Sequence, residues 1–268
     1  MNVMRRVPLL VSAIALALAA GCASNKTDNT PPAQPRIESV KAQEATPLQR
    51  AQIKTDLAAG YYERAQFEVA LEVLDEAQKI DANYPKIYNV YGLVYTMLGE
   101  TPKAEASFQR GLALAPNDPE IRANWGGFLC ATGRAREAIP ELETALRDPL
   151  FRTPEIAMIN AGKCSVALGD SKKADEYFRR AMAQSPGNPV AAYNLALLAF
   201  HEARLDDARF WMRPVMQQAA PRPEALYLGM CIERKLNDRQ AELSYISQLR
   251  NRYPDASETK AINTEGCE

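Results

Sequence analysis

The chain has 268 residues, with 32 lysines and arginines against 33 aspartates and glutamates, and its formal net charge is −1. With this balance and no basic block, it has no electrostatic footprint for binding nucleic acid. A single histidine, His201, leaves no histidine pair for a metal and no second site for a Ser/His/Asp set, and no glycine-rich phosphate loop occurs. We therefore expect no enzyme, no metal site and no small-molecule substrate.

Residues 1–21 have the features of a secretory signal peptide. Arg5 and Arg6 precede an apolar run over residues 7–20, and small residues lead to Gly21 and Cys22. The run is shorter than the about 20 apolar residues that a transmembrane helix needs. The segment therefore predicts export rather than a membrane span.

The boundary Leu18-Ala19-Ala20-Gly21-Cys22 resembles a bacterial lipobox, although lipoboxes favour leucine where Ala19 stands. The resemblance implies a covalent lipid on Cys22, palmitate among its acyl chains, and no other cofactor. Several acyl chains anchor a protein firmly. No aspartate follows the cysteine, which by resemblance to bacterial sorting patterns implies a lipid-anchored protein on the periplasmic face of the outer membrane. The alternative is ordinary secretion with Cys22 as an incidental thiol.

Residues 22–47 are expected to form the lipidated N-terminus and a disordered tether. They are polar and rich in proline, with almost no large apolar side chains. A flexible chain of this length has a root-mean-square reach of about 25–30 Å.

Residues 48–256 carry an internal repeat. Ala70, Ala104 and Ala138 stand 34 residues apart, and Ala174 and Ala208 repeat that interval. A small residue at this fixed phase is typical of tetratricopeptide (TPR) repeats, in which two helices cross closely. We predict an all-α fold, a right-handed superhelical solenoid of about six TPR helix–turn–helix repeats.

The departures from the 34-residue interval are small. Ala138 and Ala174 are 36 residues apart, which indicates an insertion in the loop over residues 148–153. A sixth, degenerate copy contains Gly229 and Ala241, and residues 257–268 remain as a C-terminal tail. Six stacked hairpins would bury a core that none could bury alone.

Four cysteines follow Cys22, and the repeat phase places them. Cys130 and Cys164 fall near the C-terminal ends of the first helices of repeats 3 and 4, which are neighbours, so a disulfide between them is expected. Cys231 falls in the first helix of repeat 6 and can pair with Cys267 if the tail folds back. The alternative is that these cysteines are small buried core residues.

The concave face, lined by the first helix of each repeat, is the expected binding surface. TPR domains that hold peptide C-termini place Lys, Arg and Asn there, whereas Lys163 is here nearly alone as a cation. Asn194 and its equivalents are expected to bond backbone between repeats. An apolar groove suits an amphipathic or extended apolar segment, unless its residues pack within the superhelix. The predicted groove residues are Tyr62, Leu93, Met97, Ile156, Ile159, Val166, Tyr193, Leu197, Phe200, Leu226 and Met230.

Two segments carry a resemblance to a known family. Residues 124–130 read Asn-Trp-Gly-Gly-Phe-Leu-Cys and residues 160–164 read Asn-Ala-Gly-Lys-Cys. With a lipobox and six TPRs before and around them, they resemble the type IV pilus biogenesis/stability lipoproteins PilF and PilW, the pilotins. Cys130 and Cys164 match the family's cysteine pair, while the family has tyrosine at Trp125. The tail with Cys231 and Cys267 has no place in the family pattern.

The resemblance implies a non-enzymatic assembly factor. Such lipoproteins bind secretin subunits, carry them to the outer membrane through their own lipid and promote assembly of the multimeric ring. The implied partners are a secretin subunit of the type IV pilus machine and the membrane, through the lipid anchor. The alternative is a periplasmic TPR scaffold lipoprotein for outer-membrane barrel assembly or for cell-wall enzymes. A TPR enzyme would need a second domain, and too few residues follow Pro254 for one.

Overall fold

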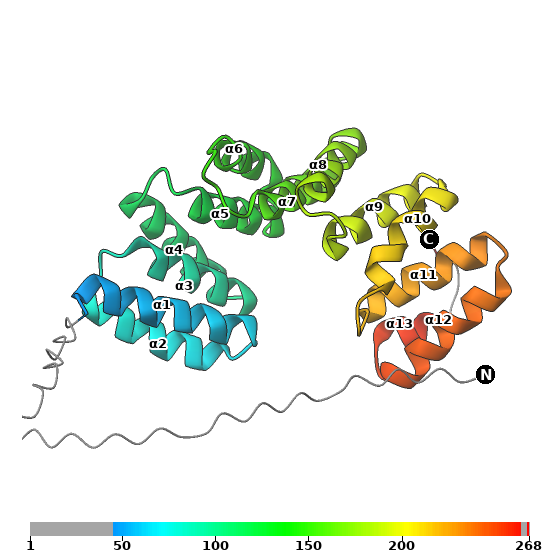
Figure 1. The fold of residues 1–268 in the computed structure, drawn as a ribbon, viewed down its shortest axis with the longest axis horizontal. Helices are drawn as coiled ribbons and strands as arrows, with labels where there is room; N and C mark the ends of the chain where they lie inside the picture. The colour runs from blue at the N-terminus through cyan, green and yellow to red at the C-terminus, as the bar shows by residue number, and fades with distance from the viewer. Residues whose placement is uncertain (1–44, 264–266, 268) are drawn as a thin grey trace, which may run out of the picture. The chain divides into compact units, whose positions relative to one another are not determined.

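A computed structural model describes residues 45–263 and 267, and within that part of the chain all regular structure is helical (Figure 1). Consecutive helices pair as α1 with α2, α3 with α4, and so on to α11 with α12. Six such pairs confirm the predicted TPR solenoid. The helices are α1 (Pro47–Glu63), α2 (Phe67–Ile80), α3 (Pro85–Met97), α4 (Thr101–Leu114), α5 (Pro119–Ala131), α6 (Ala135–Ala145), α7 (Pro154–Ala167), α8 (Ser171–Gln184), α9 (Pro189–His201), α10 (Leu205–Met216), α11 (Pro223–Lys235), α12 (Arg239–Arg252) and α13 (Ser257–Ala261).

The first helix of every repeat begins with proline, whose fixed φ and missing N–H suit the first helical position. The preceding residue often supplies the cap. Asp118 accepts hydrogen bonds from the backbone of α5, and Asn188 does the same for α9. At the turn inside each repeat one residue has a positive φ, which is glycine at Gly99, Gly133 and Gly169. These local signals set the length of each helix.

Within a repeat, a missing side chain on the first helix admits a large one from the second. A Cβ on Gly92 would lie 2.6 Å from the ring of Phe108, and one on Gly229 would lie 2.8 Å from the ring of Tyr245. Phe108 is fully buried. Glycine therefore permits the close crossing of the two helices, as carbon atoms otherwise keep about 3.5–4.0 Å apart.

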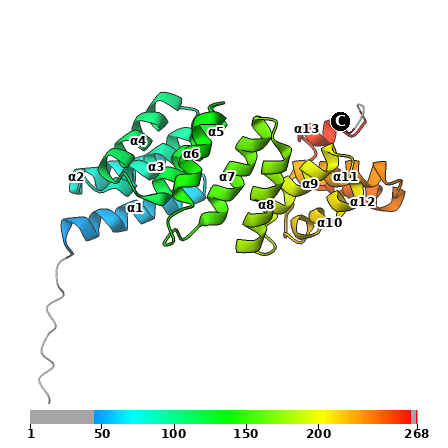
Figure 2. The same cartoon turned by 90° about the horizontal axis from the view of Figure 1, so that it is seen from above.

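Between repeats, the first helices line up along the solenoid, α1 with α3, α3 with α5, and on to α9 with α11 (Figure 2). Ile87 on α3 and Ile121 on α5 are fully buried because each faces the repeat before it. The equivalent residue on α1, Ile53, is 63% exposed because no described repeat precedes it. Each repeat thus depends on its neighbour to bury its apolar face.

The described part of the chain refines two predicted boundaries. Helix α1 begins at Pro47 with Thr46 as its cap, one residue before the predicted start of the solenoid. The tail contains α13, and Ile262 and Cys267 beyond it are buried. The predicted signal peptide, Cys22 and most of the predicted tether lie outside the described residues. None of the described helices is long and apolar enough to cross a membrane.

Candidate functional site

A disulfide joins Cys130 on α5 to Cys164 on α7, the pair that the repeat phase predicts. Their Cα atoms lie 5.5 Å apart, and Cys164 is fully buried. The bond ties repeat 3 to repeat 4. Cys130 is half-buried against the same core, so the bond fixes α5 and α7 relative to each other.

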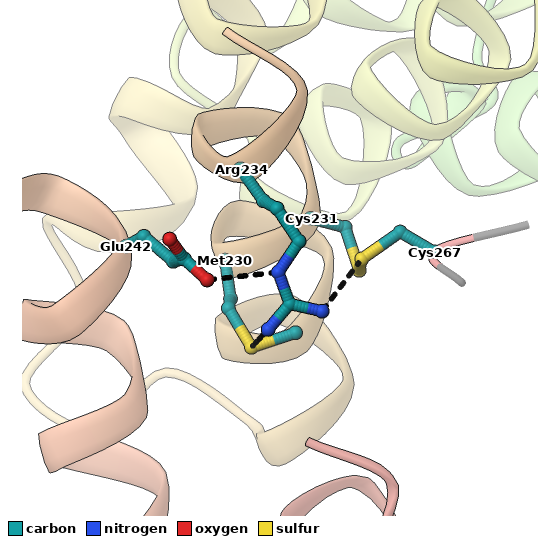
Figure 3. Close-up of a disulfide and its surroundings, with 5 residues drawn as sticks. All are labelled: Met230, Cys231, Arg234, Glu242 and Cys267. Atoms are coloured by element: carbon teal, nitrogen blue, oxygen red, sulfur yellow. Dashed lines mark hydrogen bonds and ion pairs between the residues drawn. A yellow bond between two sulfur atoms is a disulfide. The ribbon is translucent and has the colours of Figure 1, made fainter. Parts of the chain in front are cut away.

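A second disulfide joins Cys231 on α11 to Cys267 in the tail, with Cα atoms 5.3 Å apart (Figure 3). Arg234 lies beside it: its Nε donates to Glu242 Oε1 at 2.8 Å, and its Nη1 and Nη2 reach Cys267 Sγ at 3.9 Å and Met230 Sδ at 3.7 Å. The tail therefore folds back on α11 and is fixed there by a covalent bond and a buried cluster.

The carboxylate of Glu242 is the charged centre of this cluster. Its side chain is only 4% exposed and accepts hydrogen bonds from both Arg234 and Arg239. Burial alone would raise the Glu242 pKa, but the two guanidinium groups outweigh it, so the pKa lies below its usual range. The glutamate is thus charged and paired, and it ties α12 to α11.

The folded-back tail closes one wall of a cavity of about 350 Å³, which we call the aromatic cavity. The carboxylates of Glu224 and Glu258 also line this cavity. Burial first, and then these two charges, raise the pKa of the Tyr193 hydroxyl. The cavity therefore offers aromatic rings beside negative charge. Its walls are Tyr193, Leu197, Phe200 and His201 of α9, Glu224, Tyr227, Leu228 and Cys231 of α11, and Ser257, Glu258, Ala261 and Cys267 of the tail.

A second hollow of about 540 Å³ adjoins the aromatic cavity and shares Tyr193 and Glu224 with it; we call it the cationic hollow. Lys163 of α7 and Arg222, just before α11, line it, and neither forms an ion pair within the part of the chain described here. Lys163 is exposed as a residue, but the neighbouring residues of the hollow partly desolvate its ammonium group. This desolvation, followed by the charge of Arg222, lowers the Lys163 pKa. Asn194 completes the hollow.

The predicted groove residues divide into three groups. Tyr193, Leu197 and Phe200 line the aromatic cavity, although Phe200 is only 6% exposed. The other eight line neither hollow: five of them keep exposed surface on first helices and three lie in the core. Met97, Ile156 and Val166 are exposed on first helices, and Tyr62 and Leu93 are half-buried.

The prediction of an open groove is wrong for Ile159, Leu226 and Met230. Leu226 and Met230 have no exposed surface, because they belong to the core that Ile262 and Cys267 of the tail complete. Ile159 is 6% exposed and packs in a core shared with α9. The alternative left open for these residues, packing within the superhelix, is the one the structure shows.

Other sequence expectations also change. Asn194 does not bond backbone between repeats, since its amide donates to the carbonyl of Val190 in its own helix at 2.7 Å. His201 is exposed and lines the aromatic cavity. No group of three metal-ligating side chains occurs within residues 45–263 and 267.

Sequence reasoning missed Arg222, Glu224 and Glu258. Arg222 and Glu224 stand at the start of α11, where Ala208 and Ala241 are only 33 residues apart, so the 34-residue phase does not place them. Their charge next to a predicted helix start was the available signal. Glu258 lies in the non-repeating tail, where no periodicity could place it.

Comparison with known proteins identifies the family. Two models of the tetratricopeptide repeat match, one over residues 55–119 and 129–189 and the other over residues 165–228. The crystal structure of PilW, a widely conserved type IV pilus biogenesis factor, is 30% identical in sequence with a TM-score of 0.70, and the match covers 80% of this chain and 98% of PilW. The chain belongs to the PilF/PilW family of type IV pilus biogenesis TPR proteins.

The other PilF/PilW relatives agree. The type IV pilus assembly protein PilF of Pseudomonas aeruginosa is 26% identical over 209 residues, which are 78% of this chain and 83% of PilF. The structure of Pseudomonas aeruginosa PilF, 25% identical, has a TM-score of 0.70 and covers 82% of this chain and 99% of its own. TPR proteins of this kind are scaffolds that bind partner proteins. The surfaces of the solenoid are therefore the places to consider for partner binding.

Proposed function

We propose that the protein is a pilotin: an outer-membrane lipoprotein that binds secretin subunits of the type IV pilus machine and promotes their localisation and multimerisation. The observation that supports this most is the likeness to PilW and PilF, which spans about four fifths of this chain and nearly all of theirs. So long a match leaves no large region of the chain outside the family pattern.

The chemistry of the chain fits such a role. The lipobox-like boundary at Cys22 would supply an anchor in the outer membrane, and residues 22–46 would span the distance from the anchor to the solenoid. A solenoid made of stacked helix pairs keeps its surface in a fixed arrangement, which lowers the entropy lost when a partner binds. Anchoring the partner raises its local concentration at the membrane, which favours ring assembly.

The first test is deletion of the gene, scored by heat-stable secretin multimers in the outer membrane and by surface pili. We expect both to be lost and to return with the wild-type protein. Normal multimers and pili, with disturbed outer-membrane barrels or cell wall, would instead support the scaffold alternative.

The second test separates the lipid from the solenoid. Cys22→Ala should leave a folded protein that fractionates away from the outer membrane, and secretin multimers should fall with it. Ser24→Ala, two residues further along, is the matched control and should behave as wild type. A Cys22→Ala protein that still sediments with the outer membrane would contradict the lipid-anchor proposal.

A further inference from the structure

The aromatic cavity and the cationic hollow adjoin each other, and we call the two together the groove of α7, α9 and α11. Tyr193 and Glu224 line both of them, so a ligand bound in one lies beside the other. The two parts differ in charge. Lys163 and Arg222 line only the cationic hollow, Glu258 lines only the aromatic cavity, and Glu224 lines both.

The charges of the groove are not neutralised by the chain itself. Within the described residues, Lys163, Arg222, Glu224 and Glu258 form no ion pair, although 14 ion pairs occur elsewhere in the solenoid. Lys163 and Arg222 repel each other in the cationic hollow, where Glu224 is the one carboxylate among its lining residues. One added carboxylate would balance the two positive charges. The cationic hollow therefore fits an acidic side chain.

The aromatic cavity fits a basic side chain. Rings attract a cation over their faces, as Lys235 shows by placing its ammonium 4.9 Å from the centre of the Phe200 ring. Tyr193 and Tyr227 offer further ring surface in the same cavity, and Glu258 adds a carboxylate from the tail. An arginine or lysine entering here would meet aromatic surface along its stem and negative charge at its head.

We propose that this groove binds an extended segment of a partner protein that carries a basic and an acidic side chain two positions apart. In an extended chain, side chains at i and i+2 point to the same side, about 6.5–7 Å apart. The basic side chain would enter the aromatic cavity while the acidic one lies at Lys163 and Arg222. The inference does not depend on which protein supplies the segment, and its test uses peptides alone.

The disulfide of the tail is part of this site. Cys267 is bonded to Cys231, as Figure 3 shows, and Glu258 stands nine residues before it. The covalent link therefore holds the wall that carries the carboxylate against α11. Without the bond, the short helix α13 keeps its packing on α11 and α12 and the hydroxyl of Thr259, which donates to the carbonyls of Leu249 and Tyr253. Glu258 thus acts as a binding residue, and the disulfide positions it.

The experiment uses the full-length protein in detergent and a fluorescein-labelled octapeptide of serine and threonine with Arg-Thr-Glu at its centre. Fluorescence anisotropy gives the Kd. Replacing the arginine or the glutamate of the peptide by glutamine should weaken binding about tenfold each, as for one charge-assisted contact. Placing the two charges side by side, on opposite faces of the extended peptide, should weaken it similarly. Equal Kd values for all four peptides, or no binding of any, would overturn the proposal.

Variants assign each charge to its place. Glu258→Gln should weaken the binding of the Arg-Thr-Glu peptide about tenfold and leave the Kd of the peptide that lacks arginine unchanged. Lys163→Gln should also weaken the binding of the Arg-Thr-Glu peptide about tenfold, but it should leave the Kd of the peptide that lacks glutamate unchanged. Lys172→Gln and Glu176→Gln, exposed on α8 outside the groove, are the matched controls and should change nothing. Losses that do not depend on the matching charge of the peptide would contradict the assignment.

A last variant tests the wall. Cys267→Ser should keep the helical circular dichroism signal. It should weaken binding of the Arg-Thr-Glu peptide to the Kd expected for Glu258→Gln. An unchanged Kd would show that the disulfide does not position Glu258, and self-association of the protein that the peptide cannot displace would show that a second copy occupies the groove instead.

Discussion

Replacing Gly162 by alanine puts one methyl group where the two helices of repeat 4 cross. A Cβ built on Gly162 would lie 2.7 Å from both Cδ1 and Cζ of Phe178, while unstrained carbon atoms keep about 3.5–4.0 Å. Phe178 is fully buried, so its ring has no solvent side to turn towards. The methyl group therefore has to push α7 and α8 apart or distort the ring.

The expected size of the effect follows from two opposing terms. Overpacking a core costs about 1–3 kcal/mol, and the overlap of nearly 1 Å at Phe178 places this site at the upper end. Alanine in a helix interior is better than glycine by about 1 kcal/mol. We expect Gly162→Ala to lower the free energy of unfolding by about 2 kcal/mol. In a Phe178→Ala background the ring is gone, and Gly162→Ala should raise the free energy of unfolding by about 1 kcal/mol.

Urea unfolding followed by circular dichroism measures both steps of this cycle, with the m values compared because repeat arrays can unfold in parts. Gly60→Ala is the matched control: its nearest neighbour is an amino group of Arg64 at 3.8 Å, so it should stabilise α1. If Gly162→Ala destabilises equally with and without the ring of Phe178, the crossing is not what requires glycine.

Two further predictions concern stability. Cys130→Ser opens a disulfide between residues 34 apart in sequence and should lower the free energy of unfolding by about 4 kcal/mol without reductant. The urea midpoints of variant and wild type should converge when dithiothreitol is added. Equal midpoints without dithiothreitol would count against a stabilising bond. Glu242→Gln removes a carboxylate whose pKa is depressed in the folded protein. Above the unfolded pKa of about 4.3, the wild type should therefore have the higher free energy of unfolding. The difference should vanish as the pH falls through the lower pKa of the folded protein. Titrating both proteins in urea from pH 7 to pH 2.5 checks the sign, and a difference that grows in acid would contradict it.

The repeat architecture could be predicted because its signal lies in residue size at a fixed phase. Ala70, Ala104 and Ala138 have no exposed surface, as a close helix crossing requires. The same phase places Cys130 and Cys164 near the C-terminal ends of adjacent first helices, which is why their pairing could be predicted.

The exposed surface could not be predicted equally well, since exposure depends on what lies beyond the repeat. Leu226 and Met230 occupy positions that face the groove in a regular repeat, yet the tail buries them. The tail has no repeat partner, so no periodicity shows where Glu258 will stand. The charges that make the groove distinctive come from such irregular places: a shortened loop at Arg222 and the tail at Glu258.

The fit of a missing side chain against a large one also bears on how the sequence can change over time. Where the first helix has alanine instead, as at Ala196, the opposing buried residue in the same repeat is the flexible Met212 rather than a ring. The two residues of each such pair constrain each other within one repeat, so substitution at one position is restricted until the residue at the other has changed. Among relatives, glycine should give way to alanine together with loss of the opposing ring, and these exchanges should occur repeat by repeat without reference to the rest of the solenoid.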